Sequence, residues 1–291
     1  MKRICIVKLR SAGDVFRTTP ILRAFSDCEI SWITDEKSYP FIEDNPLIQN
    51  IFLIENLPTL KRFDALYNFD EDKMACKIAE SIPSDIKKGY GWRNNGFYPF
   101  DKDSDYAYRL TKDDELKFKS NKKTYQQIIF EMAGMKWRRE DYVLSYRPTN
   151  RIAHQVGLNY MVGEKFLNKL WANWKDLAKL IPDISIQIKF KTPQEYINWI
   201  NSCSIIVTSD SLGMHIALAL KKRVVALFGE TSMNEIEMYG RGIKLSANFP
   251  CSPCYRKEKC NIKPSCMEMI SAEAVCAIIK RWLSNEGNNK K

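Results

Sequence analysis

Short buried strands alternate with helical segments in both halves of this 291-residue chain, and that alternation is the strongest constraint on its fold. An apolar run at 4–9 predicts a strand, which is followed by a loop at 11–15 and by a helix at 20–25 with Thr19 as its N-cap. Further strands are predicted at 29–34, 51–54 and 65–68. This order opens a βα unit and predicts an α/β fold with a mostly parallel sheet.

The second half repeats the alternation after a polar, proline-containing segment at 146–151. Strands are predicted at 152–159, 184–188, 205–208 and 224–228, and helices at 171–180, 193–203 and 212–220. Two such halves indicate two doubly wound domains with a cleft between them. We expect an N-terminal domain over 1–148, a C-terminal domain over 149–283 and a frayed tail over 284–291.

Composition excludes several classes of protein. With 45% apolar and 27% charged residues, twelve Gly and twelve Pro, the chain is neither disordered nor collagen-like. No apolar run approaches the roughly 18 residues of a membrane-spanning helix, and the N-terminal apolar run is too brief for a signal peptide. Nine cysteines, an odd number, fit a reducing compartment better than a disulfide framework. We therefore expect a globular protein of the cytoplasm.

The excess positive charge is concentrated in the second half of the chain. Residues 1–148 hold 25 basic and 23 acidic side chains, a net charge of +2, whereas residues 149–291 hold 20 and 12, a net charge of +8. This asymmetry favours an anionic partner on the C-terminal half. Nucleic acid, a phospholipid surface and a nucleotide diphosphate all satisfy that condition.

The segment 205–215, IIVTSDSLGMH, is typical of a phosphate-binding strand end. Asp210 and Ser211 follow the predicted strand, and the helix after them begins with backbone N–H groups that have no acceptor within the helix. Those N–H groups belong to Leu212, Gly213 and Met214. The alternative interpretation is structural, with Asp210 or Ser211 as a simple N-cap and His215 as a core histidine.

The segment SAGD, residues 11–14, is the corresponding loop of the first half. Gly13 allows a ligand to approach the backbone beside Ser11, and Asp14 is placed where a base can face the cleft; a turn or an N-cap is the alternative role. The sequence contains no GxGxxG after the first strand, no P-loop, no HExxH and no GxSxG. These absences disfavour a dehydrogenase, an NTPase, a zincin and a serine hydrolase, and leave acid–base transfer chemistry.

Three stretches of the sequence resemble glycosyltransferase family 9, the ADP-heptose:lipopolysaccharide heptosyltransferases. They are KRICIVKLRSAGDVFRTTPILRAF, VTSDSLGMHIALALKKRVVALFGETS and CSPCYRKEKCNIKPSCMEMI, and FDALYNFDED and KTYQQIIFEMAG match between them. The resemblance implies a GT-B fold, in which two Rossmann-like domains face each other across a cleft. It also implies that the acceptor binds the N-terminal domain and the nucleotide sugar binds the C-terminal domain.

The family resemblance implies an inverting transfer of a sugar to a hydroxyl. Asp14 matches the family's GD aspartate and would act as the base, while Lys169 matches a lysine that neutralises the departing diphosphate. Asp210 and His215 match the family's D-[ST]-x-x-x-H element, which binds the donor sugar. The implied partners are a nucleotide-diphosphate sugar, ADP-heptose first, and a lipid-linked or glycan acceptor. Such an acceptor would bring the basic half against the anionic inner face of the membrane.

The sequence also departs from the family pattern. Leu212 and Gly213 reverse the usual order of small and large residues, and FGET replaces the common FGPT, which places Glu230 near the expected phosphate. We find no match for the carboxylate that contacts the nucleoside in longer relatives. Lys169 has a simpler alternative role as one of several solvated lysines.

Four cysteines near the C-terminus form a cluster in the sequence: Cys251, Cys254, Cys260 and Cys266. Their spacing is compatible with a structural Zn or Fe site, with reduced free thiols or with disulfides. Each of these roles is structural, so no cofactor is required for catalysis. Three further functions remain open. The chain could transfer another nucleotide-activated sugar, or transfer its sugar to a protein hydroxyl, and it could be a degenerate, non-catalytic family member. It could also be a nucleic-acid-binding module, which is the least favoured alternative because such modules need no large α/β body.

Overall fold

The computed structural model describes residues 1–163, 166–256 and 258–288, which divide into two compact units. The first unit comprises Met1–Arg147 and the short segment Asn234–Glu237, and the second comprises Pro148–Met233 and the chain from Met238 onward. Asn234–Glu237 was not part of the predicted N-terminal domain.

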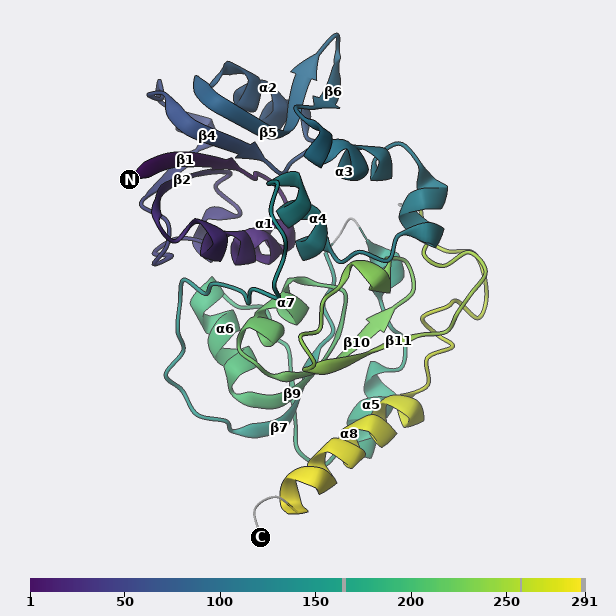
Figure 1. Ribbon diagram of the computed structural model, residues 1–291. Helices are drawn as coiled ribbons and strands as arrows, with labels where there is room; N and C mark the ends of the chain where they lie inside the picture. The colour runs from purple at the N-terminus through teal and green to yellow at the C-terminus, as the bar shows by residue number, and fades with distance from the viewer. Residues whose placement is uncertain (164–165, 257, 289–291) are drawn as a thin grey trace. The chain divides into compact units, whose positions relative to one another are not determined.

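The first unit contains a six-stranded sheet in the order β3-β2-β1-β4-β5-β6 (Figure 1). The strands are β1 (Lys2–Val7), β2 (Cys28–Thr34), β3 (Asn50–Leu53), β4 (Phe63–Asn68), β5 (Ser84–Arg93) and β6 (Gly96–Pro99). All neighbours are parallel except the pair of β5 and β6. The helices are α1 (Ala12–Thr18), α2 (Lys73–Ser81), α3 (Asp105–Leu110) and α4 (Tyr125–Met132). Strand order reverses between β1 and β4, and such a switch point is where open α/β sheets bind ligands.

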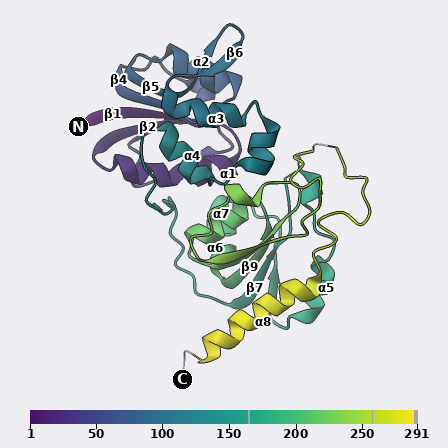
Figure 2. The ribbon, with the colours of Figure 1, turned by 45° about the vertical axis from the view of Figure 1, so that its right-hand side comes forward.

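The second unit contains a parallel five-stranded sheet in the order β11-β10-β9-β7-β8. The strands are β7 (His154–Asn159), β8 (Ile184–Ile186), β9 (Cys203–Ser209), β10 (Arg223–Phe228) and β11 (Gly242–Ser246). The helices are α5 (Trp174–Leu180), α6 (Pro193–Asn201), α7 (Leu212–Ala219) and α8 (Ala272–Asn288). Helices α5 and α8 lie side by side in both views (Figures 1 and 2). The switch point of this sheet lies between β7 and β9.

The central strands are continuous apolar runs because helices cover both faces of each sheet. Ile205, Ile206 and Val207 of β9 are fully buried, and so are Val224 and Val225 of β10. An apolar residue at every position of a strand is typical of parallel sheets covered on both faces. This is the physical reason why the central strands could be predicted from the sequence, whereas β5, β6 and β11, which lie at or next to sheet edges, were not predicted.

The course of the chain after β1 differs from the prediction. Residues Ala12–Thr18 form helix α1, so the predicted loop at 11–15 is wrong, and Thr19–Phe25 form a 3₁₀ helix instead of an α-helix capped by Thr19. The hydroxyl of Thr19 donates to the carbonyl oxygen of Phe16, so it does not cap the segment that follows. Ser11 precedes α1 with a left-handed φ of 66°, an unusual backbone conformation for a residue with a Cβ.

Helix α8 extends farther than the sequence suggested. The predicted tail at 284–291 begins inside this helix, which reaches Asn288, and 289–291 lie outside the described residues. The buried side chains of Val275 and Ile279 anchor the helix on the second unit. None of the helices in the described part of the chain combines the length and apolar character that crossing a membrane requires.

Candidate functional site

A buried ion pair occupies the switch point of the first unit. Lys8 follows β1 and Asp70 follows β4, and Lys8 Nζ lies 3.3 Å from Asp70 Oδ2. Burial disfavours the charge of Asp70, but the Lys8 ammonium and backbone N–H groups outweigh it and lower its pKa. Burial likewise disfavours the charge of Lys8, but Tyr125, Asp70 and Asp14 together raise its pKa. Both side chains are therefore charged at neutral pH.

Asp70 also holds the segment that leads into helix α1. Its Oδ2 accepts hydrogen bonds from the backbone N–H of Leu9 at 3.1 Å and of Arg10 at 3.5 Å. These bonds link two strand ends that are about 60 residues apart in the sequence. Asp70 thereby fixes the backbone immediately before Ser11, the N-cap residue of the helix that contains Asp14.

Asp14 lies in the first turn of α1, where Arg17 and Tyr125 surround it. Arg17 Nε is 2.9 Å from Asp14 Oδ1, and the Arg17 guanidinium lies over the Tyr125 ring at 3.7 Å from its centroid. Tyr125 Oη is 2.9 Å from the hydroxyl of Thr18. The Asp14 side chain remains 37% exposed, so this carboxylate is oriented by a cation and still accessible to a substrate. Ser11 is exposed and Gly13 is half-buried beside it.

Replacing Asp70 with Asn is expected to destabilise the first unit by about 3–5 kcal/mol at pH 7, because it leaves Lys8 charged, buried and unpaired. Since folding lowers the pKa of Asp70, its stabilisation is present above the unfolded value of 3.8 and is lost as the pH falls below it. The difference from the parent should therefore shrink in acid. Urea unfolding at several pH values measures this.

Asp72→Asn is the matched control for that experiment. Asp72 pairs with the exposed Arg10 and caps α2 through a side-chain oxygen that Asn also provides, so its loss should cost less than about 1 kcal/mol. Equal stability of Asp70→Asn and the parent at neutral pH would contradict the role assigned to the buried pair.

A polar network lies at the switch point of the second unit. Asn159 ends β7, and its amide donates to the hydroxyls of Thr208 at 2.8 Å and of Ser211 at 3.0 Å. The same two hydroxyls are 2.9 Å apart, and Tyr196 Oη donates to the amide oxygen of Asn159. These bonds fix the turn between β9 and α7. Because the hydroxyl of Ser211 is used here, it makes no cap bond although Ser211 is the N-cap residue.

The first turn of α7 offers fewer donors than the sequence suggested. Met214 donates its N–H to the carbonyl oxygen of Ser211 at 3.1 Å, so the expectation of a free donor at Met214 is wrong. Leu212 and Gly213 hold the first two N–H groups of the helix, which have no acceptor within it. A Cβ at Gly213 would lie 2.2 Å from Tyr196 Oη, so packing against α6 requires this glycine.

Lys169 and Asp210, predicted from separate motifs, meet beside this turn. Lys169 Nζ donates to the Asp210 carbonyl oxygen at 3.0 Å and to Oδ2 at 3.1 Å, and both side chains are largely buried. The Lys169 carbonyl oxygen accepts from the hydroxyl of Ser209 at 2.7 Å, which ties the turn containing Lys169 to the end of β9. Asp210 uses two of the three ammonium donors, and Nζ also lies 4.7 Å from the centre of the Phe166 ring, so a ligand would compete only with this weaker contact for the third donor. His215 is buried within α7.

Glu230 follows β10 and adds a second carboxylate next to this pair. Its side chain is only 1% exposed, and neither carboxylate oxygen has a hydrogen-bond partner within the described residues. Burial raises the pKa of Glu230 to about 7, with Lys169 lowering it and Asp210 raising it. Its backbone carbonyl oxygen accepts hydrogen bonds from the N–H groups of Cys254 and Tyr255.

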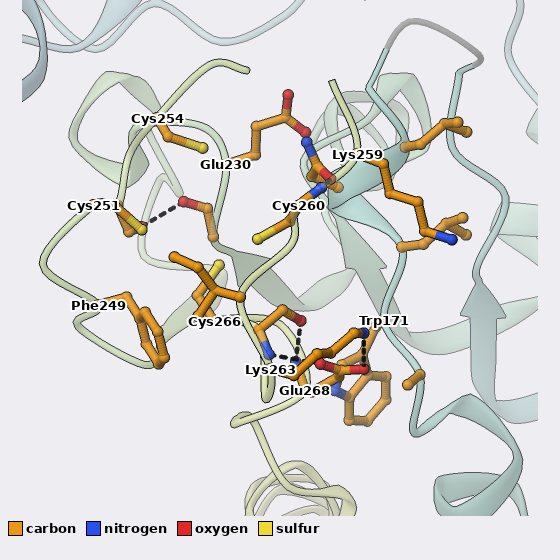
Figure 3. A pocket seen from close by; sticks show the side chains of 18 residues that line it. Trp171, Glu230, Phe249, Cys251, Cys254, Lys259, Cys260, Lys263, Cys266 and Glu268 are labelled. Carbon is orange, nitrogen blue, oxygen red and sulfur yellow. Dashed lines mark hydrogen bonds and ion pairs between the residues drawn. The ribbon is translucent and has the colours of Figure 1, made fainter. Parts of the chain in front are cut away.

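The four clustered cysteines line one cavity of about 430 Å³, which Figure 3 shows with their thiols. They are Cys251, Cys254, Cys260 and Cys266, all of them free. In residues 1–163, 166–256 and 258–288, no three His, Cys, Asp or Glu side chains come together as a metal-binding group. The thiols as placed therefore do not fit a Zn or Fe ion.

Several residues of these strand ends escaped the sequence analysis: Lys8, Asp70, Arg17, Asn159 and Tyr196. Asp70 had a usable signal, because it lies in FDALYNFDED directly after a buried strand. Arg17 also had a local signal, because it follows Asp14 by three residues on α1. Lys8, Asn159 and Tyr196 have no local pattern that marks them, since their partners are distant in the sequence.

The family model for glycosyltransferase family 9 (heptosyltransferase) matches residues 191–264. This stretch includes Asp210, the first turn of α7 and Glu230. No curated protein sequence matches the chain. The family match agrees with the resemblance seen in the sequence and supports a glycosyltransferase.

Solved structures of glycosyltransferases resemble nearly the whole chain. A family 9 glycosyl transferase from Veillonella parvula DSM 2008 has a TM-score of 0.66 at 16% identity, over 98% of each chain. E. coli heptosyltransferase WaaC, with ADP-2-deoxy-2-fluoro heptose, has a TM-score of 0.62 at 14% identity, over 96% of this chain and 99% of WaaC. The iron-containing dodecameric glycosyltransferase TibC from enterotoxigenic E. coli H10407 has a TM-score of 0.63 at 13% identity, over 98% of this chain and 76% of TibC. These similarities confirm the predicted α/β GT-B fold with two Rossmann-like domains.

Proposed function

We propose that this chain, a protein of the glycosyltransferase family 9 (heptosyltransferase) type, moves a heptose or a related sugar from a nucleotide diphosphate to an acceptor hydroxyl. The acceptor is a lipopolysaccharide core or another surface glycan, and the transfer inverts the anomeric carbon. The observation that supports this most strongly is the pairing of Lys169 with Asp210 at the switch point of the second unit, beside the first turn of α7. A cation and unpaired backbone donors at a strand end suit a diphosphate.

The second unit would hold the donor. Lys169 contributes its third donor to the diphosphate, and the N–H groups of Leu212 and Gly213 add two more. Asp210 keeps the ammonium of Lys169 in place. The net charge of +8 on residues 149–291 attracts an anionic donor to this half. ADP-heptose is the donor we favour, because WaaC was solved with an ADP-heptose analogue and TibC with ADP-D-beta-D-heptose.

Asp14 would supply the base. Its carboxylate takes the proton of the acceptor hydroxyl while the oxygen of that hydroxyl bonds to the anomeric carbon. The bond from this carbon to the diphosphate breaks, and its electron pair stays on the leaving oxygen, where Lys169 balances the growing charge. Arg17 orients the carboxylate, and Asp70 fixes the backbone before the helix.

The net charge of +8 on residues 149–291 is compatible with an acceptor at an anionic surface. A lipid-linked acceptor would place the basic second half on an anionic membrane surface at the cytoplasmic face, without insertion. The four cysteines have no step in the proposed transfer.

Calorimetric titration with ADP-, GDP- and UDP-sugars tests the proposal. We expect ADP-heptose to bind the parent and to bind Lys169→Met at least about tenfold more weakly, because that variant loses the cation at the diphosphate. Transfer to a glycan acceptor should follow in the parent. A parent that binds none of these nucleotides would overturn the function, and binding without transfer to any acceptor would favour a non-catalytic member.

A further inference from the structure

Glu230 stands out among the described residues because its carboxylate is buried without a partner. The strand before it, β10, ends at Phe228, so Glu230 lies at the same carboxyl edge of the sheet as Asp210 after β9. Only 1% of its surface is exposed, and both of its carboxylate oxygens lack a hydrogen-bond partner within the described chain. An isolated polar group in this state costs free energy, and native proteins rarely tolerate it without a reason.

Glu268, which lines the same cysteine-containing cavity as Glu230, shows how the fold provides hydrogen-bond partners for a structural carboxylate. Glu268 accepts hydrogen bonds from Lys263 Nζ at 2.7 Å and from the N–H of Ser265. Glu230 and Glu268 lie at opposite ends of the cavity in Figure 3. Folding therefore satisfies Glu268 and leaves Glu230 unsatisfied. A ligand that brings hydrogen-bond donors would satisfy Glu230.

The surroundings of Glu230 limit what that ligand can be. Glu230 follows β10 and Asp210 follows the neighbouring strand β9, and the charges of Lys169 and Asp210 act on Glu230. Glu230 therefore lies near the proposed diphosphate position. Ionised phosphate oxygens only accept hydrogen bonds, so they repel the ionised carboxylate of Glu230 and can satisfy no more than the O–H of its protonated form. Sugar hydroxyls donate hydrogen bonds, carry no charge and adjoin the diphosphate in a nucleotide sugar.

We propose that Glu230 accepts hydrogen bonds from hydroxyl groups of the transferred sugar and so makes the site prefer a sugar-bearing nucleotide to the free nucleoside diphosphate. The proposal rests on the proposed function and adds a specificity-determining residue to it. After transfer the hydroxyls are gone, and the carboxylate again faces only the diphosphate. Product release is then favoured.

Binding of ADP-heptose and of ADP to the parent, Glu230→Met and Glu230→Gln tests this inference. Met has a similar length and no oxygen, so Glu230→Met should bind ADP-heptose at least about tenfold more weakly and ADP equally well or more tightly. Gln keeps one acceptor and should lie between the two. Both variants remove a buried carboxylate that has no partner, so neither should have a lower melting temperature than the parent. A structural role for Glu230 would predict a lower melting temperature.

Glu268→Gln is the matched control, and it should leave both affinities unchanged while lowering the melting temperature. Unchanged affinity of Glu230→Met for ADP-heptose would overturn the inference. An equal loss of affinity for ADP-heptose and for ADP would also overturn it, because Glu230 would then contact the ribose or support the fold. These outcomes differ from failure of the proposed function, in which the parent itself binds neither nucleotide.

Discussion

Replacing Asp14 with Asn is expected to lower turnover at least about 100-fold while leaving donor affinity close to that of the parent. An amide keeps the shape of the side chain but cannot take the proton of the acceptor hydroxyl, and loss of a general base costs roughly 10² to 10⁴ in rate. Donor affinity should survive because Asp14 belongs to the first unit, whereas the proposed diphosphate contacts belong to the second. Single-turnover measurements at saturating donor isolate the chemical step from product release.

The fold of Asp14→Asn should remain intact. Asp14 is partly exposed, and its contact with Arg17 is a pair of the kind that contributes roughly 0.2–1 kcal/mol. Asp72→Asn removes a carboxylate from the same edge of the same sheet and should leave turnover unchanged. Turnover of Asp14→Asn within about threefold of the parent would remove Asp14 from the role of base.

The sequence predicted the strands better than the start of α1, and the reason is physical. A strand covered on both faces needs an apolar residue at nearly every position, which is a local pattern. Helix α1 begins in the segment SAGD, whose residues favour turns, and it forms there because Asp70 holds the amides of Leu9 and Arg10. That contact spans about 60 residues and leaves no local trace in the sequence.

The same distinction applies to the candidate site. Asp14 and Asp210 could be found from the sequence because each follows a predicted strand, which places it at the ligand-binding edge. The resemblance to the family supplied Lys169, which lies in a short 3₁₀ turn without periodic pattern. Glu230 was visible only as a departure from FGPT. Its burial without a partner required the structure.

Replacing Lys169 with Met is the second large effect that we expect. Its ammonium is the side-chain cation whose third donor is available beside the first turn of α7, so its loss removes a charge where negative charge grows in the transition state. Removal of one such electrostatic contact costs roughly 10² to 10³ in turnover. Ground-state affinity for the donor should also fall, because the intact diphosphate is already anionic. Single-turnover rates and calorimetry measure the two effects separately.

A loss of activity in the Lys169 variants must be distinguished from a loss of folding. Lys169→Met leaves the largely buried Asp210 without this cation, so some loss of melting temperature is expected. Lys169→Arg keeps the charge near Asp210 and should retain more activity than Lys169→Met. Lys179→Met, which removes an exposed lysine paired with Asp176 on α5, is the matched control and should behave like the parent. If a folded Lys169→Met turned over as fast as Lys179→Met, Lys169 would not be the residue that neutralises the leaving group. Removing a full charge beside a buried diphosphate must change the rate.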